Sequence, residues 1–164
     1  MKRIILSLLL FAVLFPAAGC VRATVEGPVY QVYFLSEEVE RDLALVPEGR
    51  SLPEGEDPIE ALLAILLEGP ESEELTSPFP AGVTLRGWEL KDGVVTVDFS
   101  ARYAALSGVA LTLADYSVVD TLCQLETVDA VEITADGDRL TYRDHQRMTA
   151  SDAWTLEEIE AEEP

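Results

Sequence analysis

Carboxylate side chains beside apolar runs are the first residues in this sequence that could do chemistry. Asp98 lies near the end of an apolar, β-branched run, and Ser100 follows two positions later, so the two could form half of a carboxylate site. The competing interpretation is structural, because an Asp at such a position often caps the following turn or pairs with a nearby cation, here Arg102. We favour the structural role and keep Asp98 as a candidate interaction position.

A second pair of polar side chains, Asp120 and Thr121, lies within a stretch of helical periodicity. An apolar stripe recurs at helical spacing from Leu111 to Leu125, and the polar pair faces away from it or lies at its margin. The two side chains could form a polar site at the edge of a sheet. A side-chain interaction between this helix and a neighbouring strand explains them better, and Thr121 is a second candidate interaction position.

Cysteine, histidine and metal chemistry have little support. Cys123 lies in the helical apolar pattern, where a free thiol behaves as a small hydrophobic group, and a nucleophilic pair with His145, the single histidine, is the weaker alternative. One histidine cannot assemble a zinc site. Residues 136–138 are too short for a calcium-binding loop, which leaves a weak surface Ca²⁺ site there or along the glutamate-rich C-terminus as the alternative. Phosphate-binding and nucleophile-elbow motifs are absent from the sequence. We predict no catalytic residue, no metal and no cofactor.

The charge balance limits the partners. The chain of 164 residues carries 31 acidic and 11 Lys or Arg side chains, a net charge of −20 at pH 7. Phosphate backbones would repel such a chain, so we predict no nucleic-acid binding. Adsorption to anionic lipid is disfavoured for the same reason. A hydrophobic fraction of 48% is enough for the core of one domain.

Residues 1–20 have the composition of an export signal. A short basic start precedes an apolar run over residues 4–15, which is too short to cross a bilayer. The small residues that follow, ending at Cys20, resemble a bacterial lipobox, although Ala17 stands where Leu is usual. The alternative is an ordinary signal peptide with an incidental cysteine. We predict a diacylated Cys20 that anchors the protein at the outer face of the cytoplasmic membrane.

Residues 57–70 form the most completely marked helix. Asp57 can accept a hydrogen bond from a free N–H of the first turn, and Pro58 suits the first helical position. Apolar residues recur at helical spacing up to Gly69, whose permissive backbone closes the helix before Pro70 stops it. The apolar surface is wide, so the helix is predicted to be covered on more than one side.

The remaining pattern predicts strands. Longer strands are predicted over residues 29–35, 83–90, 94–99 and 128–135, and shorter ones over 43–46, 50–52 and 139–142. Asp92 and Gly93 separate two of these runs and predict a tight hairpin, because both turn positions need positive φ.

The order strand, helix, strand, strand, helix, strand predicts an α+β domain over residues 29–143. Two helices would pack on one mixed or antiparallel sheet. Residues 21–28 form a short tether before the domain, and residues 144–164 form an acidic tail whose composition is typical of disorder.

The residues in this order resemble the GerMN domain of sporulation and spore-germination lipoproteins. The matching segments are residues 32–34, Arg50, residues 57–58, 66–70, 93–100, 119–122, 131–133 and 136–137. The resemblance covers roughly residues 29–140 and occurs once in this chain. It implies a fold similar to the ring-building motifs of secretion-system proteins, and no catalytic residues are established for the family.

The resemblance implies a membrane-anchored protein-interaction domain. Its partners would be envelope or sporulation proteins, with self-association included. The candidate interaction or signature positions are Arg50, Gly69, Pro70, Asp98 and Thr121.

Two other functions stay open. One is a receptor for a small ligand or a cell-wall fragment, with a pocket lined by Tyr30, Trp88 or Tyr103. The other is an unrecognised envelope enzyme, which would need a base and a nucleophile that the sequence does not offer as a pair.

Overall fold

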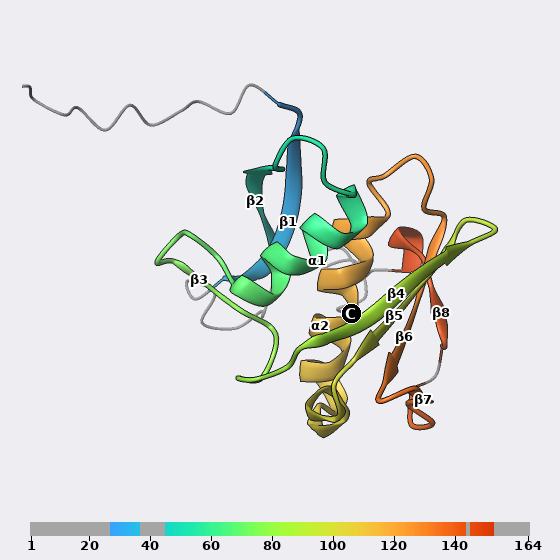
Figure 1. Cartoon of the computed structure of the whole chain (residues 1–164). Helices are drawn as coiled ribbons and strands as arrows, with labels where there is room; N and C mark the ends of the chain where they lie inside the picture. The colour runs from blue at the N-terminus through green and yellow to red at the C-terminus, as the bar shows by residue number, and fades with distance from the viewer. Residues whose placement is uncertain (1–26, 37–44, 144, 153–164) are drawn as a thin grey trace, which may run out of the picture.

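Two β-sheets and two α-helices make up the described part of the chain (Figure 1). The computed structural model describes residues 27–36, 45–143 and 145–152. The strands are β1 (Val29–Ser36), β2 (Leu45–Ser51), β3 (Leu75–Thr76), β4 (Leu85–Lys91), β5 (Val94–Phe99), β6 (Ala130–Ala135), β7 (Asp138–Arg139) and β8 (Arg147–Met148). The helices are α1 (Pro58–Glu68) and α2 (Gly108–Leu122), with 3₁₀ turns η1 (Ala101–Ala105) and η2 (Ala150–Asp152).

Helix α1 begins and ends where its sequence predicts. Asp57 Oδ1 accepts hydrogen bonds from the backbone N–H groups of Ile59 (2.9 Å) and Glu60 (3.4 Å), so the cap satisfies two first-turn donors. At the other end Gly69 adopts a φ of 94°, and its N–H donates to the carbonyl of Ile65 (3.1 Å). The buried residues of α1 are Ile59, Ala61, Leu62, Leu63, Ile65 and Leu66. The helix is therefore covered on more than one side.

Strand β1 is the centre of the first sheet, which has the order β2-β1-β3. β2 pairs antiparallel along β1, whereas β3 meets only Leu35 and Ser36. β2 is one continuous strand where the sequence predicts two short pieces, and Pro47 lies within it opposite Tyr33. Proline is tolerated there because β2 is an edge strand, with no ladder to interrupt on its outer side.

The second sheet has the order β4-β5-β6-β7, and β8 also pairs with β6. β4 and β5 form the predicted hairpin, with Asp92 (φ 50°) and Gly93 (φ 77°) in its turn. β6 runs parallel to β5, with Val97 beside Ile133, because α2 carries the chain back to the start of the sheet. The other pairs are antiparallel, so this sheet is mixed.

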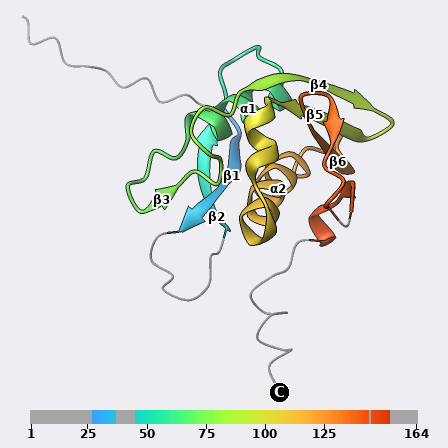
Figure 2. The same ribbon diagram turned by 90° about the horizontal axis from the view of Figure 1, so that it is seen from below.

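Helix α2 lies between the two sheets, as Figure 2 shows. Alternate residues of β5 and β6 point toward the helices and are buried: Val95, Val97, Phe99, Val131, Ile133 and Ala135. Their neighbours on the opposite face are partly exposed, except for Ala130 at the start of β6, which is buried. The α+β class with two helices is therefore confirmed, and the core lies where the helices meet the inner faces of the strands.

The strands form two sheets where the sequence predicts one, because side chains of α2 and of Gln124 just after it occupy an edge of β1. Tyr33 N donates to Thr121 Oγ1 (3.1 Å), and Ser117 Oγ donates to Tyr33 O (2.6 Å). Gln124 accepts from Gln31 N (2.9 Å) and donates to Gln31 O (2.7 Å). These side chains bond to the backbone N–H and C=O groups of β1 that another strand would otherwise pair with.

The folded domain continues past the predicted boundary at residue 143. β8 pairs with β6, and Met148 is buried, which corrects the predicted tail over residues 145–152. The segment from residue 153 onward lies outside the described residues, as does the predicted signal with Cys20. Within the described ranges, no helix has the length and apolar character needed to cross a membrane.

Candidate functional site

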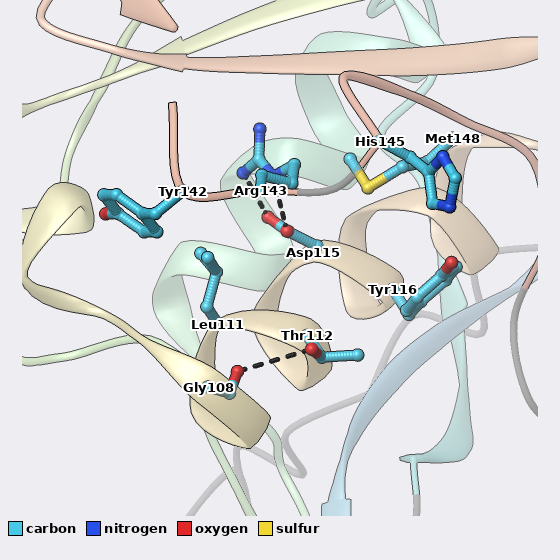
Figure 3. A pocket seen from close by; sticks show the side chains of 9 residues that line it. All are labelled: Gly108, Leu111, Thr112, Asp115, Tyr116, Tyr142, Arg143, His145 and Met148. Carbon is cyan, nitrogen blue, oxygen red and sulfur yellow. Dashed lines mark hydrogen bonds and ion pairs between the residues drawn. The ribbon is translucent and has the colours of Figure 1, made fainter. Parts of the chain in front are cut away.

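A hollow of about 350 Å³ opens between the first half of α2 and the segment that follows β7 (Figure 3). We term it the α2 hollow. Its lining residues are Gly108, Leu111, Thr112, Asp115, Tyr116, Tyr142, Arg143, His145 and Met148. Tyr142 and Tyr116 lie toward opposite ends of the hollow, and Asp115 and Arg143 lie between them.

Asp115 and Arg143 form a buried ion pair in the wall of the α2 hollow. Arg143 donates from Nε to Asp115 Oδ2 (2.8 Å) and from Nη2 to Oδ1 (2.6 Å). The side chain of Asp115 is 4% exposed and that of Arg143 is 5% exposed. Nη1 of Arg143 donates to the carbonyl of Ile133 (2.9 Å). This bidentate geometry satisfies both charges internally.

Tyr103 of η1 completes the network. Its hydroxyl donates to Asp115 Oδ1 (2.7 Å), and its fully buried ring stacks on Phe99 with centroids 4.9 Å apart. Burial, followed by the charge of Asp115, raises the pKa of Tyr103 well above its ordinary value. Burial also raises the pKa of Asp115, against the opposing effects of Arg143 and Tyr103.

Residues 140–143 and 145–148, which we term the segment over α2, are held in place by their own side chains. Gln146 Nε2 donates to the carbonyl of Leu140 (2.9 Å), and Tyr142 Oη donates to the carbonyl of Ala104 (2.9 Å). Leu140 and Met148 are buried. One wall of the α2 hollow is therefore fixed by hydrogen bonds, an ion pair and two buried side chains, which favours a pre-formed recess.

The exposed side of α2 continues beyond the hollow. Asp120 lies one helical turn after Tyr116 on the same face. It makes no hydrogen bond or ion pair with the residues that the structure describes. Burial raises the pKa of Asp120 to about 6. Burial, then the charges of Asp152, Asp115 and Asp120, raises the pKa of Tyr116, which indicates a negative potential around its hydroxyl.

A second hollow, of about 430 Å³, lies on the outer face of the five-stranded sheet. We term it the sheet hollow. Glu132 pairs there with Arg139 (3.2 Å) and Arg147 (3.1 Å). Both arginines are mostly exposed, so these pairs contribute little free energy. Thr96 of β5 also lines this hollow.

Asp98 has a structural role, with partners other than those the sequence suggests. It accepts hydrogen bonds from Thr134 Oγ1 (2.8 Å), Gly137 N (2.8 Å) and Arg86 Nε (3.1 Å). Burial opposes its ionisation, yet these bonds and the Arg86 charge together hold the pKa of Asp98 below its ordinary value. The turn it caps follows β6, and Arg102 donates to a backbone carbonyl elsewhere. Two expectations are therefore corrected. Asp98 caps the turn after β6 and not the turn after its own strand, and Arg102 is not its ion-pair partner.

Arg50, Gly69 and Pro70 meet at the end of α1. Arg50 Nη1 donates to Glu48 Oε1 (2.9 Å) and to the carbonyl of Gly69 (3.4 Å). Glu48 also accepts from the backbone N–H of Glu71 (3.1 Å). The cluster therefore joins β2 to the chain leaving α1, where Pro70 follows the helix stop.

The predicted positions consequently lie in three separate places. Arg50 lies at the end of α1, Asp98 on the outer face of β5, and Thr121 against the backbone of β1. Each has a local structural role, and the structure does not bring them together in one site.

The sequence predicts an aromatic pocket at Tyr30, Trp88 or Tyr103; Tyr103 is fully buried and cannot line one, and neither the α2 hollow nor the sheet hollow contains Tyr30 or Trp88. The α2 hollow uses Tyr116 and Tyr142 instead. These aromatic residues gave no periodic signal that set them apart from core residues.

The structure also shows where the residues considered for metal or thiol chemistry lie. His145 lines the α2 hollow, which does not include Cys123. Burial raises the pKa of the half-buried Cys123 thiol. Asp136 of the Asp-Gly-Asp turn pairs with Arg86. Across the described ranges, no group of three or more His, Cys, Asp or Glu side chains could hold a metal ion.

Sequence reasoning missed Asp115 and Arg143. Asp115 did carry a signal, because it lies beside Ala114 and close to the buried stripe of α2, where a charge requires a partner. Arg143 carried none, since no periodic element surrounds it. The pair joins residues 28 positions apart, which spacing alone does not connect.

The chain matches known proteins over most of this domain. A family model described as "Germane: Sporulation and spore germination" matches residues 31–141. The tandem GerMN domains of the sporulation protein GerM from Bacillus subtilis match 67% of this chain and 39% of that chain, with 28% identity and a TM-score of 0.57. This chain thus spans less than half of the tandem structure. The first GerMN domain of the same protein matches 79% of this chain and 98% of that chain, with 22% identity and a TM-score of 0.58. A comparison with curated proteins found no match.

Proposed function

The chain belongs to the Germane family of sporulation and spore germination proteins, and we propose that it is a lipid-anchored, extracytoplasmic protein-interaction domain. Cys20 carries the lipid and holds the protein at the outer face of the cytoplasmic membrane. The folded domain binds a protein of the cell envelope or of a sporulation or germination assembly. Family membership and the lipobox-like sequence support this proposal.

The α2 hollow is the observation that carries the proposal. Binding energy at protein interfaces concentrates in a few side chains that fill pre-formed recesses. The α2 hollow, at about 350 Å³, lies at the small end of the range of ligand recesses. Leu111 and Met148, both almost fully buried, form an apolar base of the hollow, and hydrogen bonds fix one of its walls. The sheet hollow offers mainly exposed ion pairs, which favour it less.

Binding is proposed here in place of catalysis. Asp115, the carboxylate that lines the α2 hollow, accepts hydrogen bonds from Arg143 and Tyr103. A general base must reach a substrate proton with a free lone pair. Asp115 is engaged by the protein itself, so its role is to position Arg143 and the segment over α2.

The anchor would keep the binding surface near the membrane. Gly27, which lies just before β1, follows Cys20 by seven positions in the sequence. Seven residues span at most about 25 Å when fully extended. The partner is therefore expected to be a membrane protein or a protein held at the membrane surface.

Site-directed photo-crosslinking in the native envelope tests the proposal. A photoreactive residue at Thr112, which lines the α2 hollow, should capture a defined partner that mass spectrometry identifies. The matched control is the same residue at Thr96, which lines the sheet hollow. Capture from Thr112 and not from Thr96 is expected. Monomer alone from both positions would refute an interaction role, and capture from Thr96 alone would move the binding surface to the sheet.

A further inference from the structure

We infer that the α2 hollow and the adjoining turn of α2 receive a lysine or arginine side chain of the partner, with Tyr116 against it and Asp120 as its counter-ion. The inference rests on the proposed interaction role and specifies the chemistry of the partner. The site would recognise one cationic side chain in a polypeptide segment.

Asp120 is the first observation. Its carboxylate is half-buried and unpaired among the described residues, a costly state that an incoming cation would relieve. Among the described residues, the titratable groups that its charge affects are Tyr33 of β1, Tyr116 of α2 and Cys123, which caps the end of α2. Asp152 of η2 adds a further negative charge next to Tyr116. None of these four groups is cationic.

Tyr116 and the apolar wall are the second observation. Leu111 and Met148 line the same hollow as Tyr116 and are almost fully buried, and an apolar base of this kind suits the methylene stem of a lysine or arginine. A tyrosine ring beside the charged end adds a cation–π attraction. The methylene stem of the partner's side chain would therefore lie in the hollow, with the ring of Tyr116 next to it and the carboxylate of Asp120 at its charged end.

The cations already present do not block this site. Arg143 is 5% exposed and is neutralised by the bidentate contact with Asp115. His145 also lines the hollow. The net charge of −20 would further draw a cationic segment toward the domain.

The wall of the hollow opposite α2 lies outside the part of the chain that the family model matches. The match ends at residue 141, and Tyr142, Arg143, His145 and Met148 follow it. The site is therefore inferred from this chain's own residues.

Binding of a small peptide probe to the ¹⁵N-labelled full-length chain in neutral detergent tests the inference. The probe is acetyl-Gly-Lys-Gly-amide, and its control carries norleucine in place of lysine. At about pH 7.5 the lysine probe should shift the amide resonances of Tyr116 and Asp120, and the norleucine probe should not. Affinity should fall at about pH 5, because Asp120 is then largely protonated given its pKa of about 6.

Two variants decide whether the site or the overall charge attracts the probe. Asp120→Asn should weaken binding by roughly fivefold, while Asp138→Asn, which removes the same charge from the exposed strand β7, should leave it unchanged. Equal losses in both variants, or equal binding of the norleucine probe, would overturn the inference. If Thr112 captures a partner in the envelope while the lysine probe does not bind, the interaction role stands and the cationic specificity is refuted.

Discussion

Arg143 donates two hydrogen bonds to Asp115, from Nε to Oδ2 at 2.8 Å and from Nη2 to Oδ1 at 2.6 Å. Both side chains are almost fully buried. The pair connects the segment after β7 to the middle of α2. Because a buried charge without its partner is strongly unfavourable, this contact is where the fold should be most sensitive to substitution among its ion pairs.

Arg143→Met should destabilise the domain strongly. The substitution keeps the hydrocarbon stem and removes the charge, which leaves Asp115 buried and unpaired. We expect the free energy of unfolding to fall by about 3–5 kcal/mol, measured by urea denaturation. Arg139→Met is the matched control, because Arg139 pairs with Glu132 on the surface and should change stability by less than about 1 kcal/mol. Equal effects of the two variants would contradict the assignment.

Thr121→Val should expose the edge of β1. Valine has nearly the shape of threonine but cannot accept the hydrogen bond from the N–H of Tyr33. The unpaired donor should lower the free energy of unfolding by about 1–3 kcal/mol, and amide exchange at Tyr33 should accelerate. Thr112→Val, at an exposed position where the hydroxyl only donates to Gly108 O, serves as the control. Unchanged protection of Tyr33 would show that Thr121 does not hold this edge.

Asp98 should make the domain less stable in acid. Hydrogen bonds hold the pKa of Asp98 below its ordinary value in the folded chain, so the unfolded chain binds more protons in the interval between the two pKa values. This contribution is present in full above the unfolded pKa, about 3.9, and is lost as pH falls through the folded pKa. Asp98→Asn removes it. The stability difference between wild type and variant should therefore shrink between about pH 7 and about pH 2, and a constant difference would contradict the prediction.

Cys20→Ala should release the protein from membranes. Two acyl chains on one cysteine supply stable anchoring, and alanine cannot carry them. Fractionation followed by detergent partitioning measures the change. Cys123→Ala should leave the protein in the membrane fraction, because Cys123 lies in the folded domain. Membrane retention of the Cys20 variant would refute the lipid anchor.

Local signals in the sequence predict the local structure well. Asp57 and Gly69 mark the ends of α1, and Asp92-Gly93 marks the hairpin, because caps and tight turns depend on the chemistry of adjacent residues. Pro47 misled the assignment of β2, since a proline reads as a break unless the strand is known to lie at an edge.

Long-range relationships could not be predicted in the same way. The division into two sheets depends on Ser117 and Thr121 meeting the backbone of Tyr33, more than 80 residues away in sequence. The α2 hollow depends on Arg143 reaching Asp115. Neither contact has a periodicity of its own, so only the folded arrangement shows it.

The contact between the α2 region and β1 has a consequence for folding during synthesis. Gln31 emerges early in synthesis, but Gln124, which completes its hydrogen bonds, follows 93 residues later. Until then one side of β1 presents unpaired backbone groups beside apolar side chains, a known route to aggregation. A contact of such long sequence separation also slows folding. The chain is thus expected to depend on a holdase chaperone until α2 and Gln124 have been synthesised.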